Sequence, residues 1–378
     1  MDITPKRPPT VLLNPGPCNT SARVKNALLR HDVCHRDPEY SEDLLRVSHK
    51  LGKIFRAGPD HRVLILTGSG TAAMEASIAS VVPDGRKVLV IDNGAFGERI
   101  AEIARLHELD VVHLRYEYGQ TVDPADVRAA LDEYPEVAVV AMVHHETSVG
   151  LLNPVAAIGK LCRERDCLLL VDAVSSLGAE DLDVVRDHID VCWGSANKCL
   201  HAAAGVSFVC VAPRVWPRIS KIKPRVYYLD LNRYRKYLDE RAQTPFTPAV
   251  GTIYALEAAC DEWLEDGREQ RLALYAERNR KLREGLARLG FTSYTETGVE
   301  SHSIVTARLP EGVTFEDLYD ALKARGFVIY DCKPPLQGCY IQIANMGDLA
   351  DSAFDEFLLA LEERLASLRH TARRRARA

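Results

Sequence analysis

An aspartate and a lysine follow two neighbouring apolar runs of the sequence. Asp172 comes directly after Leu168–Val171, and Lys198 comes shortly after Ile189–Trp193. Short apolar runs are typical of buried parallel strands, and ligands bind to open α/β sheets at the strand ends. A lysine amine forms a Schiff base with an aldehyde, and a carboxylate pairs with a protonated pyridine nitrogen. The two residues therefore predict a catalytic pair that holds pyridoxal 5′-phosphate (PLP).

A glycine turn between a strand at 63–66 and the helix that follows could bind a phosphate. The backbone of Gly70 and the hydroxyls of Ser69 and Thr71 would face an anion at the helix N-terminus. The same turn fits the dinucleotide motif G-x-G-x-x-A, with Asp92 near the distance expected for a ribose-binding acid. Three interpretations stay open here: a PLP phosphate site, a dinucleotide site, or a turn without a ligand.

Two more strand ends could add groups to the same pocket. Phe96 lies in a glycine-flanked turn, where a planar ring could stack on it. Thr147 follows the strand 137–143, in a segment that begins with His144 and His145. Because adjacent residues of a strand point to opposite faces, these two histidines would not bind one metal ion together. We predict that Thr147 lies near the cofactor ring and that the protein has no metal site.

The alternation of strands and helices from residue 63 to 193 indicates a doubly wound α/β sheet that would position these residues. Residues 205–211 are expected to form an antiparallel strand. A long helix follows over 254–289, with a break near Asp266-Gly267. The predicted divisions are an N-terminal arm over 1–20, a large PLP-binding domain over 21–255, a small C-terminal α+β domain over 256–368 and a basic, disordered tail over 369–378.

The composition is that of an ordinary globular protein, with 378 residues, 47% hydrophobic residues and a net charge of −5. A chain without an excess of basic residues is not expected to bind nucleic acid. No apolar run approaches the length of a membrane span, and the N-terminus lacks the apolar centre of a signal peptide. The ten cysteines contain no Cys-x-x-Cys pair and are expected to be reduced thiols. We therefore predict a cytoplasmic protein with a small-molecule substrate and no nucleic-acid or membrane partner.

The motifs together resemble those of the class V aminotransferases of PLP fold type I, and most of all those of the 2-aminoethylphosphonate–pyruvate transaminases. The likeness runs from Asn14-Pro15-Gly16-Pro17 to Asn345-Met346-Gly347. The motifs that carry it are Gly68-Ser69-Gly70, Asn93-Gly94-Ala95-Phe96-Gly97, Met142-Val143-His144-His145-Glu146-Thr147, Asp172-Ala173-Val174-Ser175-Ser176 and Ser195-Ala196-Asn197-Lys198-Cys199. The resemblance implies a mostly parallel sheet of the seven-stranded type, sandwiched by helices, a smaller α+β domain, and aminotransferase activity.

The resemblance also implies roles around the cofactor ring. Lys198 would bind PLP and move the proton of the substrate's Cα. Asp172 would contact the pyridine nitrogen. Phe96 would stack on the ring, and Thr147 would approach the ring hydroxyl.

At the other end of the cofactor, the phosphate would be held by Ser69, Gly70 and Thr71. Ser195 is also expected to belong to the cofactor site. Thr247 resembles a residue that reaches the phosphate from a neighbouring subunit. The resemblance therefore implies a homodimer with its active sites at the interface.

One position departs from the family pattern. The family usually has an arginine that binds the substrate carboxylate, and Gln342 occupies that position here. A neutral amide does not replace a bidentate arginine–carboxylate pair, so Arg36 or Arg99 is considered as an anion-binding residue instead. The departure leaves two functions open: amino transfer, or another PLP reaction of a specialised biosynthetic pathway, such as elimination, replacement or carbon–carbon bond formation on an amino acid.

Overall fold

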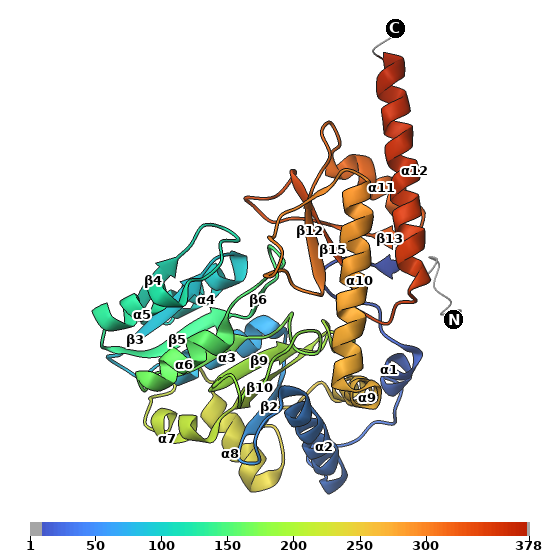
Figure 1. Ribbon diagram of the computed structural model, residues 1–378. Coiled ribbons are helices and arrows are strands. Elements are labelled where there is room, and N and C mark those ends of the chain that lie inside the picture. The colour runs from blue at the N-terminus through green and yellow to red at the C-terminus, as the bar shows by residue number, and fades with distance from the viewer. Residues whose placement is uncertain (1–9, 376–378) are drawn as a thin grey trace.

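The computed structural model describes residues 10–375, which form two main sheets with helices around them (Figure 1). The larger sheet has seven strands, and every strand except β10 runs in the same direction. The predicted mostly parallel, seven-stranded sheet is therefore confirmed. Across the sheet the strands are β2 (Arg62–Thr67), β10 (Val206–Val211), β9 (Val191–Ser195), β8 (Leu168–Asp172), β5 (Val137–Val143), β3 (Lys87–Asp92) and β4 (Asp110–Arg115).

Helices cover both faces of the large sheet because successive strand residues point to opposite sides. In β2, Val63 and Ile65 belong to one buried cluster, whereas Leu64 and Leu66 belong to the other. The first face packs against α2 (Pro38–Phe55), α5 (Pro124–Glu133), α6 (Val155–Glu164) and α9 (Val250–Asp266). The second face packs against α3 (Gly70–Val81), α4 (Ala95–Leu106), α7 (Trp216–Ile219) and α8 (Leu231–Arg241).

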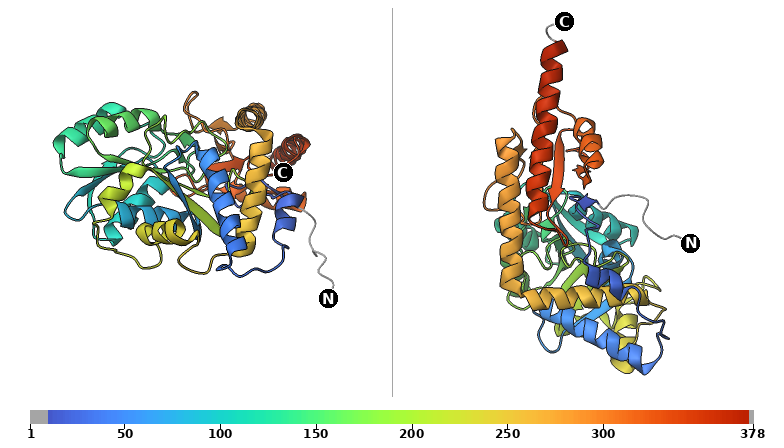
Figure 2. Two further views of the ribbon diagram at one scale, coloured as in Figure 1. Left: turned by 90° about the horizontal axis from the view of Figure 1, so that it is seen from below. Right: turned by 90° about the vertical axis from the view of Figure 1, so that its right-hand side faces the viewer.

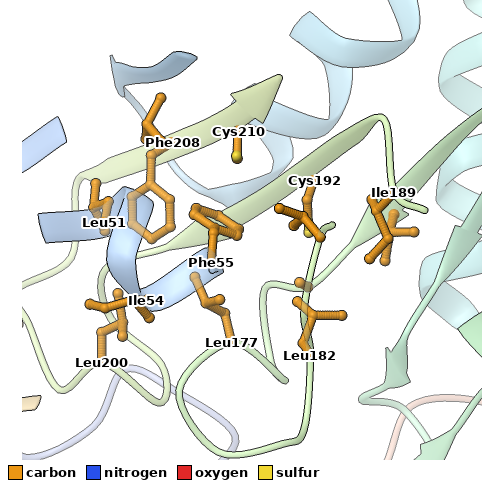
Figure 3. Packing of buried hydrophobic residues seen from close by; sticks show 14 of the residues in the cluster. Leu51, Ile54, Phe55, Leu177, Leu182, Ile189, Cys192, Leu200, Phe208 and Cys210 are labelled. Carbon is orange, nitrogen blue, oxygen red and sulfur yellow. The ribbon is translucent and has the colours of Figure 1, made fainter. Parts of the chain in front are cut away.

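The buried cluster on the first face packs against β9, the strand that leads to Lys198 (Figure 3). Phe55 of α2 meets Phe208 of β10 edge to face, with ring centres 5.8 Å apart. A Cβ atom on Gly194 would lie 2.5 Å from the Phe208 ring, so this position of β9 needs a glycine. Close packing therefore holds the end of β9 against its neighbour, and the site begins at that end.

The smaller sheet is antiparallel and has its own buried core. Its strands are β11 (Thr292–Ser293), β12 (Ile304–Arg308), β15 (Tyr340–Ala344) and β14 (Tyr330–Asp331), in that order across the sheet. The helices around it are α10 (Arg268–Arg288), α11 (Phe315–Ala324) and α12 (Ser352–Arg375). The shorter elements are β1 (Val11–Leu12), β6 (His145–Glu146), β7 (Leu151–Leu152), β13 (Phe327–Val328), α1 (Ala22–Ala27) and a 3-10 turn (Pro213–Val215).

The described part of the N-terminal arm is extended, as predicted. Its strand β1 pairs in parallel with β13 beside the smaller sheet, and its residues Pro15 and Gly16 reach Lys198. The arm therefore links the two sheets at the site. Residues 1–9 lie outside the described part of the chain.

The predicted break in the long helix is confirmed at Gly267, which has φ +81° and separates α9 from α10. Helix α9 packs in the core of the large sheet as far as Trp263, and α10 packs on the smaller sheet through Leu282 and Leu286. The boundary predicted at residue 255 lies inside α9. We propose that the two domains divide at Gly267, where the two cores separate.

The C-terminal tail corrects a prediction, because α12 continues to Arg375 and residues 369–375 are helical rather than disordered. Figures 1 and 2 show this helix extending beyond the other elements. Alanine and arginine are good helix formers, which favours a helix over this stretch. Residues 376–378 lie outside the described part of the chain.

None of the helices within residues 10–375 is both long and apolar enough to span a membrane. The ten cysteines are free thiols, and all are buried except Cys34 and Cys339.

Candidate active site

The candidate active site lies where the parallel strands of the large sheet end. Because β8 and β9 run in the same direction, their last residues, Asp172 and Ser195, share one edge of the sheet. Both side chains are buried. Lys198 follows in the loop after β9, and its amine lines the same cavity. The strand topology thus brings together an amine and a carboxylate that are separate in the sequence.

The N-terminal arm positions the side chain of Lys198. Its Nζ donates a hydrogen bond to the carbonyl oxygen of Pro15. A Cβ atom on Gly16 would lie 2.7 Å from Lys198 Cδ, so any side chain there would displace the lysine. Burial lowers the pKa of the Lys198 amine. A lowered pKa increases the unprotonated fraction, which is the nucleophilic form.

Asp172 is a buried carboxylate that forms no ion pair within residues 10–375. Its Oδ1 accepts a hydrogen bond of 2.8 Å from the backbone N–H of Val174. Burial raises the pKa of Asp172 to about 6, against the opposing effect of this hydrogen bond and of the charges on Arg99 and Lys198. A buried carboxylate of this kind is stabilised by a cation placed against it, such as a protonated ring nitrogen.

The N-terminus of α3 is open to the same cavity. Ser69 occupies the N-cap position without a side-chain cap, and the N–H groups of Gly70 and Thr71 have no acceptor in the described chain. Uncapped N–H groups at a helix start attract anions. A Cβ atom on Gly70 would lie 2.8 Å from the Val174 side chain, so the glycine leaves this end of the cavity open.

Glu146 holds the first turn of α4, which carries Phe96. Its Oε2 accepts hydrogen bonds of 3.2 Å from the N–H groups of Phe96 and Gly97, and its Oε1 accepts one of 3.1 Å from Ser148. The carboxyl is fully buried, and burial raises its pKa to about 7. A carboxylate at a helix N-terminus stabilises that helix. Glu146 therefore fixes the position of the Phe96 ring and of Arg99 one turn later.

Thr147 closes one side of the site. Its Oγ1 donates a hydrogen bond of 2.7 Å to Ser175 Oγ, and the residue is buried. Burial lowers the pKa of His144 to about 4 and that of His145 to about 3, so both rings are neutral near pH 7. Within the described residues, no group of three or more His, Cys, Asp and Glu side chains gathers as metal ligands.

Two adjoining cavities make up the site. The inner cavity has a volume of about 170 Å³, and the outer cavity has a volume of about 250 Å³. Both are lined by Phe96, Arg99, Thr147 and Lys198. The predicted cofactor residues that line the inner cavity are Ser69, Gly70, Thr71, Phe96, Thr147, Asp172, Ser195 and Lys198. A larger surface groove of about 810 Å³ between α2 and the end of α8 holds none of these residues.

Three predicted residues do not line the inner cavity. Arg36 donates hydrogen bonds to the carbonyl oxygens of Thr244 and Pro245, at 2.7 and 3.1 Å, and lines neither cavity of its own chain. Thr247 is exposed in the same segment and also lines neither cavity. Gln342 lines the outer cavity, where its Nε2 donates to the carbonyl oxygen of Thr147 at 2.6 Å. The described chain thus brings only Gln342 of this group to the site.

Several site residues were not assigned a role from the sequence. Asn197 lines the inner cavity and accepts a hydrogen bond of 2.5 Å from Ser195 Oγ. Tyr330 and Lys333, from the smaller sheet and its following loop, line the outer cavity. The signal for Asn197 was present, because it directly precedes Lys198. No local pattern pairs Glu146 with α4 or marks Lys333 as a site residue.

The inner cavity fits PLP in the chemistry of its donors. An amine of lowered pKa, a buried carboxylate and an open helix N-terminus match an aldehyde, a pyridine nitrogen and a phosphate. The dinucleotide alternative has less support, because Asp92 is buried and its carboxylate accepts hydrogen bonds from His113 and Gly94 at 2.8 and 3.2 Å. Asp92 is therefore occupied within the protein.

Similarity to known proteins agrees with this arrangement. The sequence profile of the family "Aminotransferase class-V" matches residues 20–331. The chain is 36% identical to a 2-aminoethylphosphonate–pyruvate transaminase of Burkholderia ambifaria, over 86% of this chain and 88% of that protein. It is also 36% identical to an uncharacterized aminotransferase of Methanocaldococcus jannaschii, over 89% of this chain and 88% of that protein.

Solved structures show the same fold. An alanine–glyoxylate aminotransferase from Nostoc sp. superposes with a TM-score of 0.90 at 28% identity, over 96% of this chain and 97% of that one. An aspartate aminotransferase of subgroup IV from Thermus thermophilus superposes with a TM-score of 0.87 at 32% identity, over 94% of this chain and 99% of that one.

Proposed function

The chain belongs to the class V aminotransferase family, and we propose the residue roles, substrates and assembly through which it works. It is a PLP-dependent aminotransferase of fold type I. The observation that carries the proposed roles is the convergence of Lys198, Asp172 and the α3 N-terminus on one cavity of about 170 Å³. Bound PLP supplies an electron sink for the bonds at the substrate's Cα.

Each residue of the inner cavity has a proposed task. Lys198 Nζ would hold the cofactor through its aldehyde and would move the proton at the substrate's Cα. Asp172 would keep the pyridine nitrogen protonated. The Phe96 ring would stack on the cofactor ring, and the Thr147 hydroxyl would contact the ring hydroxyl.

The opposite end of the inner cavity is proposed to bind the cofactor phosphate. Ser69, Gly70 and Thr71 offer backbone N–H groups and hydroxyls at the start of α3. Ser195 completes this set from the end of β9. These contacts anchor the cofactor while Lys198 is free to act as a base.

We propose that the amino donor is a small amine with a phosphonate group and that the acceptor is a 2-oxo acid. Relatives that are 32–36% identical to the chain are named 2-aminoethylphosphonate–pyruvate transaminases. The outer cavity also carries two cationic side chains, Arg99 and Lys333. Elimination, replacement or carbon–carbon bond formation is not favoured, because these relatives are transaminases.

The half-reactions give the direct test of this function. The visible absorption band of the purified holoenzyme should disappear on addition of 2-aminoethylphosphonate and return on addition of pyruvate, with one alanine formed per site. The Lys198→Ala variant serves as the control and should show neither change. A band that no amine of a broad panel removes would contradict amino transfer.

We further propose a homodimer in which Thr247 serves the neighbouring subunit's site. Thr247 is exposed, and the rings of Tyr227 and Tyr228 pack around the adjacent Phe246, with centres 5.7 and 4.9 Å away. Tyr227 is 69% exposed and Tyr228 is 41% exposed. Large exposed apolar side chains beside a predicted site residue fit the surface of a second copy.

Mixed dimers test whether Thr247 acts across the interface. Lys198→Ala and Thr247→Arg should each be inactive alone, because each dimer then lacks one group at both sites. After unfolding and refolding together, the hybrid dimer has one complete site, so the mixture should regain about a quarter of wild-type activity. A mixture that stays inactive while native mass spectrometry shows hybrid dimers would contradict the role of Thr247.

A cytoplasmic location is also proposed. The ten cysteines are free thiols, which is typical of proteins in a reducing compartment. Fractionation of cells that express a tagged chain would test the location, with enrichment in an oxidising compartment as the contrary result.

A further inference from the structure

Two cationic side chains face the outer cavity beside one aromatic ring. Arg99 Cζ lies 4.7 Å and Lys333 Nζ lies 5.0 Å from the centre of the Phe96 ring. Both line the outer cavity, and neither forms an ion pair with an acidic side chain in the described part of the chain. Two like charges repel each other when they are held close together. The charge of Arg99 lowers the pKa of Lys333, so an anion bound in the outer cavity that both side chains line would reduce this repulsion.

The surroundings of Lys333 support this interpretation. Burial lowers the pKa of Lys333, the charge of Arg99 lowers it further, and the carboxyl of Glu146 opposes both effects. Glu146 forms no ion pair with Lys333, because its oxygens accept hydrogen bonds from Phe96, Gly97 and Ser148. The Glu146 carboxyl is therefore already engaged by the first turn of helix α4 and by Ser148.

Gln342 is not available to bind an anion. Its Nε2 donates to the carbonyl oxygen of Thr147 at 2.6 Å and to Thr306 Oγ1 at 3.1 Å. These two bonds use both N–H groups of the amide. The remaining amide oxygen is an acceptor, which repels a carboxylate or phosphonate oxygen. The side chain is also 2% exposed, so it has little freedom to turn.

We propose that Lys333 and Arg99 together bind the anionic group of the substrate, and that this pair replaces the family's arginine at position 342. The preferred ligand is a short primary amine that ends in a phosphonate, with its amino group toward Lys198 and its phosphonate toward Lys333. Two cations favour a phosphonate over a carboxylate because the phosphonate carries more charge and a third oxygen. This inference rests on the proposed function, since it names the substrate class of the same site.

Arg99 could also bind the cofactor phosphate, which is an anion like the substrate's phosphonate. Its Nη1 donates a hydrogen bond of 3.3 Å to Thr71 Oγ1 at the start of α3, and it lines both cavities. Lys333 lines only the outer cavity. Lys333 therefore separates the two sources: its loss should weaken substrate binding and leave cofactor binding unchanged.

The test measures binding of methylphosphonate to the PLP-loaded enzyme by isothermal titration calorimetry. Methylphosphonate carries the anionic group without an amine, so it cannot react. Lys333→Met should raise its dissociation constant about tenfold to a hundredfold, since a charge-assisted hydrogen bond is lost. Lys333→Arg should restore most of the affinity.

Lys323→Met is a matched control. Lys323 also lies over an aromatic ring near the smaller sheet, with Nζ 5.1 Å from the centre of the Tyr319 ring, but it is exposed and lines neither cavity. Its loss should not change the dissociation constant of methylphosphonate. Cofactor content, measured by absorbance after denaturation, should equal that of the wild type in all three variants.

Two results would overturn the inference. Unchanged methylphosphonate binding in Lys333→Met would show that the anion lies elsewhere. Loss of PLP from that variant would show that Lys333 serves the cofactor phosphate. Failure of the proposed function would give a different result. If the wild-type enzyme binds methylphosphonate through Lys333 but transfers no amino group, the anion site stands and the proposed amino transfer is wrong.

Discussion

The inner and outer cavities share Phe96, Arg99, Thr147 and Lys198, but their other lining residues come from different parts of the chain. The inner cavity is formed by the ends of parallel strands in one sheet, where Asp172 and Ser195 are buried and closely packed. The outer cavity is formed by the N-terminal arm, α4 and the smaller sheet, which contribute Pro15, Arg99 and Lys333. A rigid sheet edge suits chemistry that is common to a family, whereas separate segments can change with the substrate.

This division predicts that substitutions in the two cavities affect different steps. Inner residues should control cofactor attachment and kcat. Outer residues should control substrate affinity while cofactor content stays constant. A substitution that crosses this division would show that the two cavities act as one unit.

The largest effect is expected for Lys198→Ala, which removes the amine that holds the cofactor and moves the proton. The kcat should fall on the order of a thousandfold or more. Steady-state kinetics and the visible spectrum would measure the loss, and thermal unfolding would check that the variant is folded. Retention of wild-type turnover would place the reactive amine elsewhere.

Asp172→Asn should have the next largest effect, because it removes a negative charge and keeps the shape of the side chain. We expect kcat to fall about a hundredfold, since a neutral amide does not keep the pyridine nitrogen protonated. The dissociation constant of methylphosphonate should stay within about twofold of the wild-type value. A large change in that constant, with kcat preserved, would reverse the assigned roles of the two cavities.

Gly70→Ala should weaken cofactor binding about tenfold, because the added Cβ would lie 2.8 Å from the Val174 side chain. Fluorescence titration of the unloaded enzyme with PLP would measure the change. Gly52→Ala is a suitable control, since its added Cβ would meet Val63 at an ordinary contact distance of 4.0 Å. Equal PLP affinity in the two variants would argue against a phosphate site at α3.

The smallest effect concerns the contact between Glu180, which follows β8, and His302, which precedes β12. His302 Nδ1 and Glu180 Oε2 are 2.7 Å apart, and the hydrogen bond to Glu180 raises the pKa of His302. A histidine whose pKa is raised by folding stabilises the folded state. This contribution is fully present below about pH 6.5, the pKa of histidine in the unfolded chain, and it is lost as pH rises through the pKa in the folded protein.

His302→Gln should remove that pH-dependent contribution. The difference in free energy of unfolding between wild type and variant should decrease between pH 6 and pH 8. Its size should stay below about 1 kcal/mol, because His302 is half-exposed and solvent screens the pair. Urea titrations at several pH values would measure it, and a difference that grows with pH would contradict the assigned direction.

Much of the fold could be predicted because buried parallel strands leave a strong sequence signal. The runs that end at Val143 and Val171 form β5 and β8 as expected, with β8 one residue longer, and the strand ends then meet at one edge. Most of the predicted cofactor residues follow strand ends and so came from the same signal, whereas Thr247 was implied by the family resemblance. Only Thr247 of that set lies away from the cavity of its own chain.

The remaining features depend on contacts that sequence spacing does not reveal. Helix α8 lies in a stretch rich in charged residues and buries only Leu231 and Tyr234, so its apolar pattern is weak. Glu146 acts on a helix that begins about fifty residues earlier. Lys333 precedes two prolines and resembles a surface lysine in sequence. Each of these residues gains its role only when distant segments pack together.

The most direct measurement follows the amino nitrogen itself. Holoenzyme would be incubated with ¹⁵N-labelled 2-aminoethylphosphonate and pyruvate, and the products would be separated and analysed by mass spectrometry. The proposed function predicts that the label appears in alanine, in proportion to the amine consumed. Label released as ammonia, or retained in a product that keeps its carbon–nitrogen bond, would contradict amino transfer and favour elimination or another PLP reaction.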